Sequence, residues 1–215
     1  MGKLQMGILG GFIGKVGTFN WKGKDVMHAY KKQVANPRTE QQEAVRRRFV
    51  ACSKLASTFL QSNALGFRKY AAGEQITEEN AFMKLNMPAV AIDGSGVITV
   101  AYNNIVTAKG PLPKAIFGQA DFSTSGVVSV PFDGNVDAAR ASGADNVYLV
   151  VYSPDIDALV VSTPARRSAS AVTCELPASW TGLAVHVWGF AVGNAAGAYR
   201  DTPSDSAYIG TGEVE

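Results

Sequence analysis

The spacing of hydrophobic positions changes twice along the chain, and each segment has its own pattern. Between residues 15 and 34, strand-favouring residues lead into the turn Lys22-Gly23-Lys24-Asp25 and continue after it, which predicts a β-hairpin. From residue 39, apolar residues recur every three or four positions, which predicts a helix. After Pro88, short alternating runs are separated by Gly, Pro, Asp and Asn, which predicts antiparallel strands.

The helix has the clearest start signal in the chain. Thr39 followed by Gln42 fits a capping box, and Pro37 is tolerated only at the start of a helix. We expect this helix to run to about Phe67, a length on the order of 45 Å. Its buried stripe is predicted to consist of the apolar residues Val45, Phe49, Cys52, Ala56, Phe59 and Leu60.

A second, shorter helix is expected after the linker at residues 73–80. Thr77 is its predicted cap, and the helix stops before Pro88. Since helices joined by a short loop are usually antiparallel neighbours, we expect the two helices to pack as a pair.

Short runs that favour β-strands follow. They lie at residues 97–102, 105–107, 126–132, 146–152, 158–163, 170–176, 185–192 and 206–209. Their number and spacing are typical of an antiparallel sandwich of immunoglobulin or fibronectin type. Alternation in the run at 185–190 places one set of side chains, Val185, Val187 and Gly189, on one face and the other set, His186, Trp188 and Phe190, on the opposite face.

The predicted fold class is therefore α+β. An N-terminal β-hairpin and a long helix pair are followed by an antiparallel Ig/fibronectin-like β-sandwich. We expect residues 1–88 to form the arm, hairpin and helical region, and residues 89–215 to form the sandwich domain. A chain of 215 residues is long enough for this arrangement.

Charge is distributed unevenly between the two parts. Residues 1–70 contain thirteen basic and three acidic residues, whereas residues 71–215 contain seven basic and fifteen acidic residues. The net charge of +2 therefore conceals a basic part and an acidic part. Such asymmetry indicates contact with nucleic acid or a membrane surface, or head-to-tail association of copies.

Residue patterns that carry chemistry are few. The glycines at 7–17 do not fit a phosphate loop, because neither the first glycine nor the final Ser or Thr of that motif is in place. His186 is expected to be packed or hydrogen-bonded, Asp155-Ile156-Asp157 to form a hairpin turn rather than a calcium loop, and Arg166-Arg167 to form a solvated turn. We therefore expect no enzyme activity, no cofactor and no metal site.

Cysteine use and hydropathy bear on the compartment. There is no run of 18 apolar residues and no secretion signal is recognised, so we expect a cytoplasmic or virion-associated protein without a membrane span. Cys52 and Cys174 are expected to be buried free thiols, as in a reducing compartment.

The glycine-spaced arm at residues 7–17 suggests how the protein functions. Its apolar side chains need cover from another domain or subunit, so we expect a non-enzymatic assembly protein that associates with copies of itself in a ring or filament. The predicted oligomer interface consists of Ile8, Leu9, Phe12, Ile13, Phe19 and Trp21.

The basic amino-terminal half leaves an alternative open, which is nucleic-acid binding. Lysines and arginines would contact phosphates, and Trp21 and Tyr30 would stack on bases. The predicted phosphate contacts are Lys22, Lys24, Lys31, Lys32, Arg46, Arg47 and Arg48. A third possibility, a carbohydrate-binding module, requires Trp180 and Tyr199 to be exposed on loops.

Four motifs carry a resemblance to a known family. They are the glycine-rich stretch at residues 7–17, Trp21-Lys22-Gly23-Lys24, Asn36-Pro37-Arg38-Thr39-Glu40-Gln41, and Asp205-Ser206-Ala207-Tyr208-Ile209-Gly210. Over nearly the whole chain, the sequence resembles an uncharacterised family of Bacteroidota proteins known by a domain-of-unknown-function label. The resemblance implies no catalytic residues. The first third is also similar to phage-derived structural proteins with a carboxy-terminal fibronectin-like domain.

Overall fold

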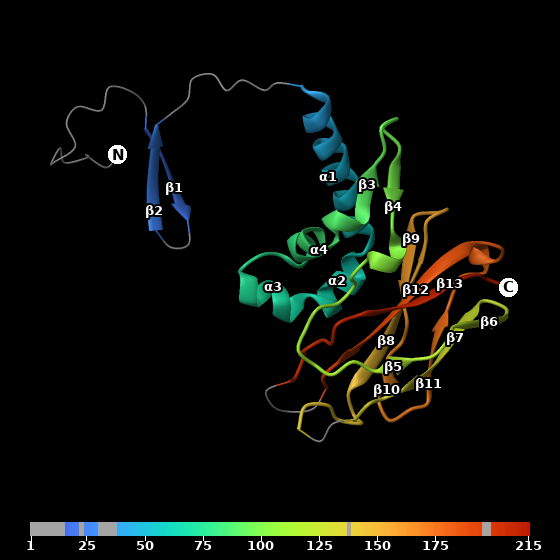
Figure 1. Cartoon of the computed structure of the whole chain (residues 1–215). Helices are drawn as coiled ribbons and strands as arrows, with labels where there is room; N and C mark the ends of the chain where they lie inside the picture. Colours follow the sequence, from blue (N-terminus) through green and yellow to red (C-terminus); the bar gives the residue numbers. More distant parts are fainter. Residues whose placement is uncertain (1–15, 22–23, 30–37, 137–138, 195–198) are drawn as a thin grey trace. The chain divides into compact units, whose positions relative to one another are not determined.

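The protein divides into two compact units, residues 1–39 and residues 40–215 (Figure 1). The computed structural model describes residues 16–21, 24–29, 38–136, 139–194 and 199–215. In the first unit, β1 (Val16–Trp21) pairs antiparallel with β2 (Lys24–Ala29), with Val16 opposite Ala29. The second unit begins at Glu40, so its boundary lies before the first helix and differs from the predicted boundary after residue 88.

The helical region consists of short helices. These are α1 (Glu40–Thr58), α2 (Leu60–Gly66), α3 (Arg68–Glu74) and α4 (Glu78–Asn86), followed by the 3-10 turn Met87–Ala89. As predicted, α1 begins at Glu40, directly after Thr39, and α4 ends before Pro88. Thr77 caps α4 as expected, because its hydroxyl accepts a hydrogen bond from the Asn80 N–H at 3.2 Å.

The prediction of one helix running to about Phe67 is wrong, because the chain turns at Phe59 and again at Phe67. Both phenylalanine rings are buried against Phe82 of α4, with centroid separations of 5.3 and 6.2 Å. A side chain also enters this region, since Asn63 donates a hydrogen bond to the Ala56 carbonyl at 3.0 Å. In a straight helix residues 59 and 67 lie about 12 Å apart along the axis and about 80° apart around it, so the turns at these positions help to bring both rings onto the single residue Phe82.

Two antiparallel sheets form the rest of the second unit. In the larger sheet the order is β10 (Ala165–Arg166), β8 (Asn146–Ser153), β12 (Ala184–Val192), β13 (Ala207–Glu213), and β9 (Ala158–Val161) also pairs with β8. In the other, β7 (Val127–Asp133) pairs with β11 (Ala171–Glu175), β5 (Ile116–Phe117) and β6 (Asp121–Thr124). A separate ribbon joins β3 (Val90–Ile92) and β4 (Ile98–Val100). The fold class α+β is confirmed.

Each face of β12 contributes to a different hydrophobic core. Val185 and Val187 are buried with residues of both sheets, including Val130 of β7 and Leu149 of β8. Trp188 and Phe190 are buried with the helices, including Phe59 and Phe82. The predicted alternation along this strand is confirmed, and the larger sheet therefore lies between the helices and the smaller sheet (Figure 1). The shared core explains why the helices belong to the same unit as the strands.

The strand predicted at residues 105–107 is not formed. After the 3-10 turn Tyr102–Asn104, a single side chain takes the place of a partner strand. Asn86 donates its amide to the Val106 carbonyl at 2.8 Å and accepts the Val106 N–H at 2.7 Å. Because Asn86 satisfies the backbone of this segment, the segment needs no ladder.

Two smaller predictions are confirmed. Cys52 and Cys174 are both buried free thiols. Residues 154–157 form the turn of the β8–β9 hairpin, with Asp157 in the left-handed region at φ 49°.

Candidate functional site

The first three turns of α1 present an unusual surface, because apolar side chains there face solvent. Val45, Phe49 and Val50 are 63%, 54% and 66% exposed, whereas Cys52, Leu55 and Ala56 farther along the helix are buried. Figure 1 shows the start of α1 beside the β3–β4 ribbon and beyond α4. The predicted stripe is therefore buried only in its second half, because α4 does not extend far enough to cover the first half.

Leu60 is also exposed, at 53%, although it was predicted to be part of the buried stripe. The turn at Phe59 separates Leu60 from the periodicity of α1, because it directs Phe59 rather than Leu60 into the core. The exposure of Leu60 therefore has a different physical cause from the exposure of Val45 and Phe49 at the start of α1.

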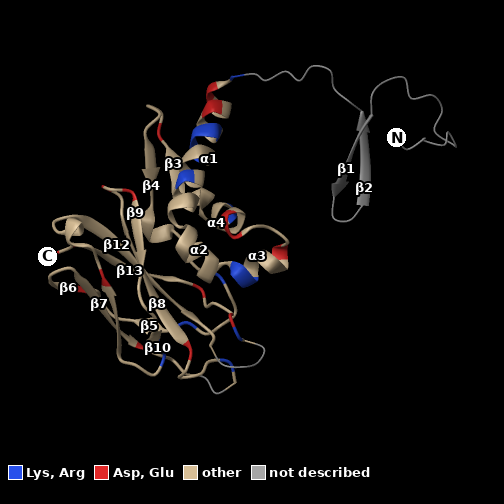
Figure 2. Ribbon diagram, turned by 180° about the vertical axis from the view of Figure 1, so that it is seen from behind, with Lys and Arg blue, Asp and Glu red and all other residues tan. Residues whose placement is uncertain are grey.

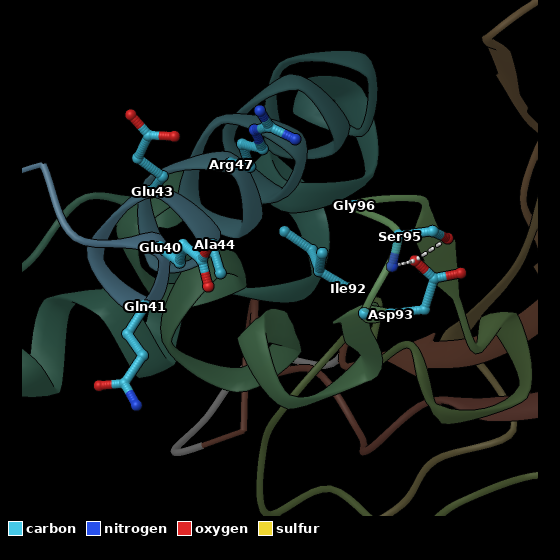
Figure 3. Close-up of a pocket in the computed structure, with 10 residues that line it drawn as sticks. Glu40, Gln41, Glu43, Ala44, Arg47, Ile92, Asp93, Ser95 and Gly96 are labelled. Carbon is cyan, nitrogen blue, oxygen red and sulfur yellow. Dashed lines mark hydrogen bonds between the residues drawn. The ribbon is translucent and has the colours of Figure 1, made fainter.

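An open pocket of about 420 Å³ lies between α1 and the turn of the β3–β4 ribbon (Figure 3). Its lining includes Glu40, Glu43, Ala44 and Arg47 from α1, and Ile92, Asp93, Ser95 and Gly96 from the ribbon. Ala44 and Ile92 provide an apolar floor, while the remaining side chains provide both signs of charge. The pocket therefore offers a ligand both an apolar surface and charged groups of either sign.

The turn that forms one wall of the pocket is fixed by its own hydrogen bonds. The Asp93 carboxylate accepts the Ser95 hydroxyl at 2.7 Å, the Ser95 N–H at 2.9 Å and the Val97 N–H at 2.8 Å. The Ser95 hydroxyl and the Val97 N–H are the main causes that lower the pKa of Asp93 below its ordinary value. Gly96 has a φ of 83°, and a Cβ there would lie 2.8 Å from an Arg47 guanidinium nitrogen. The positive φ favours glycine at this position, whereas the Arg47 guanidinium is the flexible end of an exposed side chain and can move aside.

The three consecutive arginines of α1 differ in their environment. Arg48 donates from Nε to the Val90 carbonyl at 2.9 Å and from Nη2 to the Met87 carbonyl at 2.8 Å. Arg48 thus joins α1 to the start of β3, which does not suit the predicted phosphate contact. Arg46 and Arg47 are exposed, and nucleic-acid binding through the basic half stays a prediction.

The other predicted interface and phosphate-contact residues lie in the first unit. Phe19 and Trp21 belong to β1, and Lys24 belongs to β2. The remaining ones, Ile8, Leu9, Phe12, Ile13, Lys22, Lys31 and Lys32, lie outside the described residues.

A second polar cluster connects α1 to the β8–β9 turn. The Asp157 carboxylate accepts hydroxyl hydrogen bonds from Thr58 at 3.2 Å and Tyr152 at 3.1 Å, and pairs with the Lys54 ammonium at 2.8 Å. Burial by itself raises the pKa of Asp157, but these three hydrogen bonds outweigh burial and the pKa is lowered. Because every group in the cluster is paired with another, its role is to attach the helix to the sheet.

His186 is packed among aromatic rings, in line with the prediction for this residue. Its ring stacks on Tyr102 with a centroid separation of 4.3 Å, and its Nδ1 lies 3.0 Å from the Tyr208 hydroxyl. Burial lowers the pKa of His186. Trp180 is buried in the core between the sheets, so the carbohydrate-binding possibility loses one of its two aromatic residues.

Arg167 was predicted to lie in a solvated turn, and this is wrong, since its side chain is fully buried. Its guanidinium donates to the backbone carbonyls of Gly134 and Pro113 and lies 3.8 Å from the buried Asp145 carboxylate. Desolvation by burial is the main reason that the pKa of Arg167 is lowered. The sequence gives no signal for this, because Arg166-Arg167 reads as an ordinary polar pair.

In the described parts of the chain, no group of three or more His, Cys, Asp or Glu residues could hold a metal ion. In those same parts, no helix is both long and apolar enough to cross a membrane.

Comparison with known proteins supports the resemblance to an uncharacterised family. No curated protein matches the chain. One family matches residues 8–210, which include β1, β2, the helices and most of β13. The chain belongs to this family, which is described as a family of unknown function (DUF6266).

Proposed function

We propose that this protein is a non-enzymatic structural protein that self-associates, with residues 1–39 of one copy binding the 40–215 unit of the next. The observation that carries the proposal is the division of the chain into two units of opposite charge. Residues 1–39 contain seven basic residues and one acidic residue, whereas residues 40–215 contain thirteen basic and seventeen acidic residues. Opposite charges on two surfaces of one molecule favour ordered contact between copies.

The edge strand β13 is the acceptor in this proposal. It pairs with β12 on one side and has no second partner strand among the described residues. Exposed acidic side chains, Glu213 and Glu215, lie at its carboxyl end. Extended segments often bind proteins by adding a strand to a free sheet edge, and the glycine-spaced arm at residues 7–17 has the required sequence of small and apolar residues.

The two-sheet part of the second unit is, in this proposal, an immunoglobulin- or fibronectin-like sandwich. Support comes from the antiparallel pairing within both sheets and from the core of alternating residues between them. A rigid sandwich that accepts the arm of a neighbour is a repeating unit. Because the contact is head-to-tail, it closes a ring or continues as a filament, as virion-like and phage-like structural proteins do.

Truncation tests the proposal. Removal of residues 1–17 is expected to lower the mass measured by light scattering, and electron micrographs of the full chain are expected to show rings or filaments. The variant Glu213→Lys with Glu215→Lys is expected to weaken association at low salt, because it repels the basic arm. A matched change away from the edge, Glu78→Lys with Glu79→Lys at the start of α4, serves as the control. Unchanged mass after truncation rules the proposal out.

A further inference from the structure

A short turn that lies on the larger sheet is attached to it through one aromatic ring. The 3-10 turn Tyr102–Asn104 follows β4, and its residues Asn103 and Asn104 are exposed. The ring of Tyr102 stacks on His186 of β12, with a centroid separation of 4.3 Å and an angle of 26° between the ring planes. Nδ1 of His186 in turn lies 3.0 Å from the Tyr208 hydroxyl of β13. His186 therefore joins the turn to two strands.

The segments on either side of this turn are fixed by other contacts. Before the turn, the Ala101 N–H donates a hydrogen bond to the Ala89 carbonyl at 2.9 Å. After the turn, Ile105 is buried and Asn86 bonds both backbone groups of Val106. The turn can thus open locally while its two ends stay in place.

We propose that His186 is a pH-sensitive attachment point, from which the Tyr102–Asn104 turn is released when the imidazole is protonated. Release uncovers the His186 ring and the neighbouring ring of Tyr152, whose centroid lies 5.7 Å from that of Tyr102. The event takes place within one copy of the chain and therefore does not depend on the proposed function. The other histidine of the chain, His28, belongs to β2 in the first unit.

Few charged groups lie near His186. Neither β8 nor β12 contains a Lys, Arg, Asp or Glu, and β13 contains only Glu213 (Figure 2). Glu213 is exposed and lies on the same face of β13 as Thr211, the residue opposite His186. Asp157 of the β8–β9 turn is already paired with Lys54 at 2.8 Å. Protonation therefore places a positive charge beside aromatic rings without a paired carboxylate.

The titratable side chains that surround the imidazole are three tyrosines, Tyr102, Tyr152 and Tyr208. Burial is the largest cause that raises the pKa of each tyrosine, and the negative charges of Asp157 and Asp155 add to the rise for Tyr102. All three stay neutral in mild acid, whereas burial lowers the pKa of His186. The closed turn is thus fully stabilised above about pH 6.5, the ordinary histidine pKa, and loses this stabilisation as pH falls through the lowered pKa.

Hydrogen exchange of the full chain, followed by mass spectrometry, measures the opening of the turn. The Asn104 and Ile105 amides report it, because they donate to the Ala101 and Tyr102 carbonyls at 2.9 and 3.1 Å. Protection factors compare each rate with that of an unstructured chain at the same pH. Between pH 7 and pH 5 these two are expected to fall severalfold, with a limit of about 25-fold set by the ordinary histidine pKa. Protection of the β8 amides is expected to fall less.

Two variants separate the charge of His186 from its packing. His186→Phe keeps an aromatic ring beside Tyr102, His186→Gln keeps a polar group near Tyr208, and neither side chain titrates. Protection of the turn is therefore expected to be the same at pH 7 and pH 5 in both variants. His28→Phe is the matched control and is expected to retain the fall seen in the wild-type protein. Circular dichroism verifies that each variant is folded.

Three results would overturn the proposal. One is unchanged protection of the wild-type turn at pH 5, which indicates that the imidazolium stays stacked on Tyr102. Another is a fall that both His186 variants retain, which indicates that a different group titrates. The third is an equal fall in the turn and in β8, which indicates a loss of stability of the whole unit.

Discussion

Replacing Asp157 with Asn tests how the helices are held on the larger sheet. Asp157 lies in the β8–β9 turn and accepts hydrogen bonds from Thr58 at the end of α1 and from Tyr152 of β8. Asn keeps the size of the side chain and tolerates the left-handed backbone at φ 49°. Asp157→Asn therefore removes the negative charge and leaves the turn in place.

The magnitude follows from the partners of the carboxylate. Hydrogen bonds to a charged group contribute about 1.5–3 kcal/mol and neutral ones about 0.5–1.5 kcal/mol, so loss of charge weakens the two bonds from Thr58 and Tyr152 by at most about 2–3 kcal/mol in total. The Lys54 side chain is 74% exposed, and such surface pairs contribute close to nothing. Since the Asp157 side chain is itself 30% exposed, we expect unfolding to require about 1 kcal/mol less in Asp157→Asn.

The difference should depend on pH in a defined direction. The pKa of Asp157 is lowered in the folded protein, below the value of about 3.9 for an unfolded chain. The stabilisation is therefore fully present above about pH 4. As pH falls through the folded pKa, protonation neutralises Asp157. The difference in the free energy of unfolding between the wild-type protein and Asp157→Asn then disappears.

Urea unfolding followed by tryptophan fluorescence measures this difference, because Trp180 and Trp188 are buried in the two cores. Asp155→Asn is the matched control, since Asp155 is an exposed residue of the same turn. Equal losses in Asp157→Asn and Asp155→Asn at pH 7 would refute the reasoning. A loss in Asp157→Asn that persists unchanged at pH 3 would refute the electrostatic explanation.

Five further substitutions test the packing by urea unfolding. Phe59→Ala empties a buried site between helices and sheet and should cost about 3–5 kcal/mol, whereas Leu60→Ala should cost far less because Leu60 is exposed. Gly66→Ala places a Cβ against a backbone carbonyl and should cost about 1–3 kcal/mol, whereas Gly73→Ala in α3 meets nothing within 4 Å and should stabilise by about 0.5–1 kcal/mol. Arg167→Met removes the buried cation beside the Asp145 carboxylate and the donor to the Gly134 and Pro113 carbonyls and should cost about 3–5 kcal/mol. Two results would contradict these placements. One is a loss of stability below about 1 kcal/mol for Phe59→Ala or for Arg167→Met. The other is a loss for Gly66→Ala that is no larger than the loss for Gly73→Ala.

Local signals predicted the elements well. Thr77 and Pro88 mark the start and end of α4, and the alternation at 185–190 assigns the two faces of β12. These predictions succeed because caps, proline and period-two spacing act within a few residues. The strands β3, β5, β6 and β10 were not predicted as elements of their own, since strands of two to four residues carry too little periodicity.

Tertiary contacts decided what the sequence did not predict. The turns at Phe59 and Phe67 arise because both rings pack on Phe82, and helical spacing alone continues through both positions. Arg167 is buried by carbonyls and a carboxylate from distant segments, which no local pattern records. At the candidate site, the arginines were recognised from sequence, but the exposure of Phe49 depends on where α4 ends.

The central claim is that the apolar, basic arm of one copy binds another copy, and a binding titration tests it most directly. A fluorescent peptide of residues 1–17 is titrated with protein lacking those residues, and anisotropy is measured. Saturable binding is expected, with loss of binding when Ile8, Leu9, Phe12 and Ile13 are replaced by Ser. Anisotropy that stays unchanged, or that rises equally for both peptides, would contradict the claim.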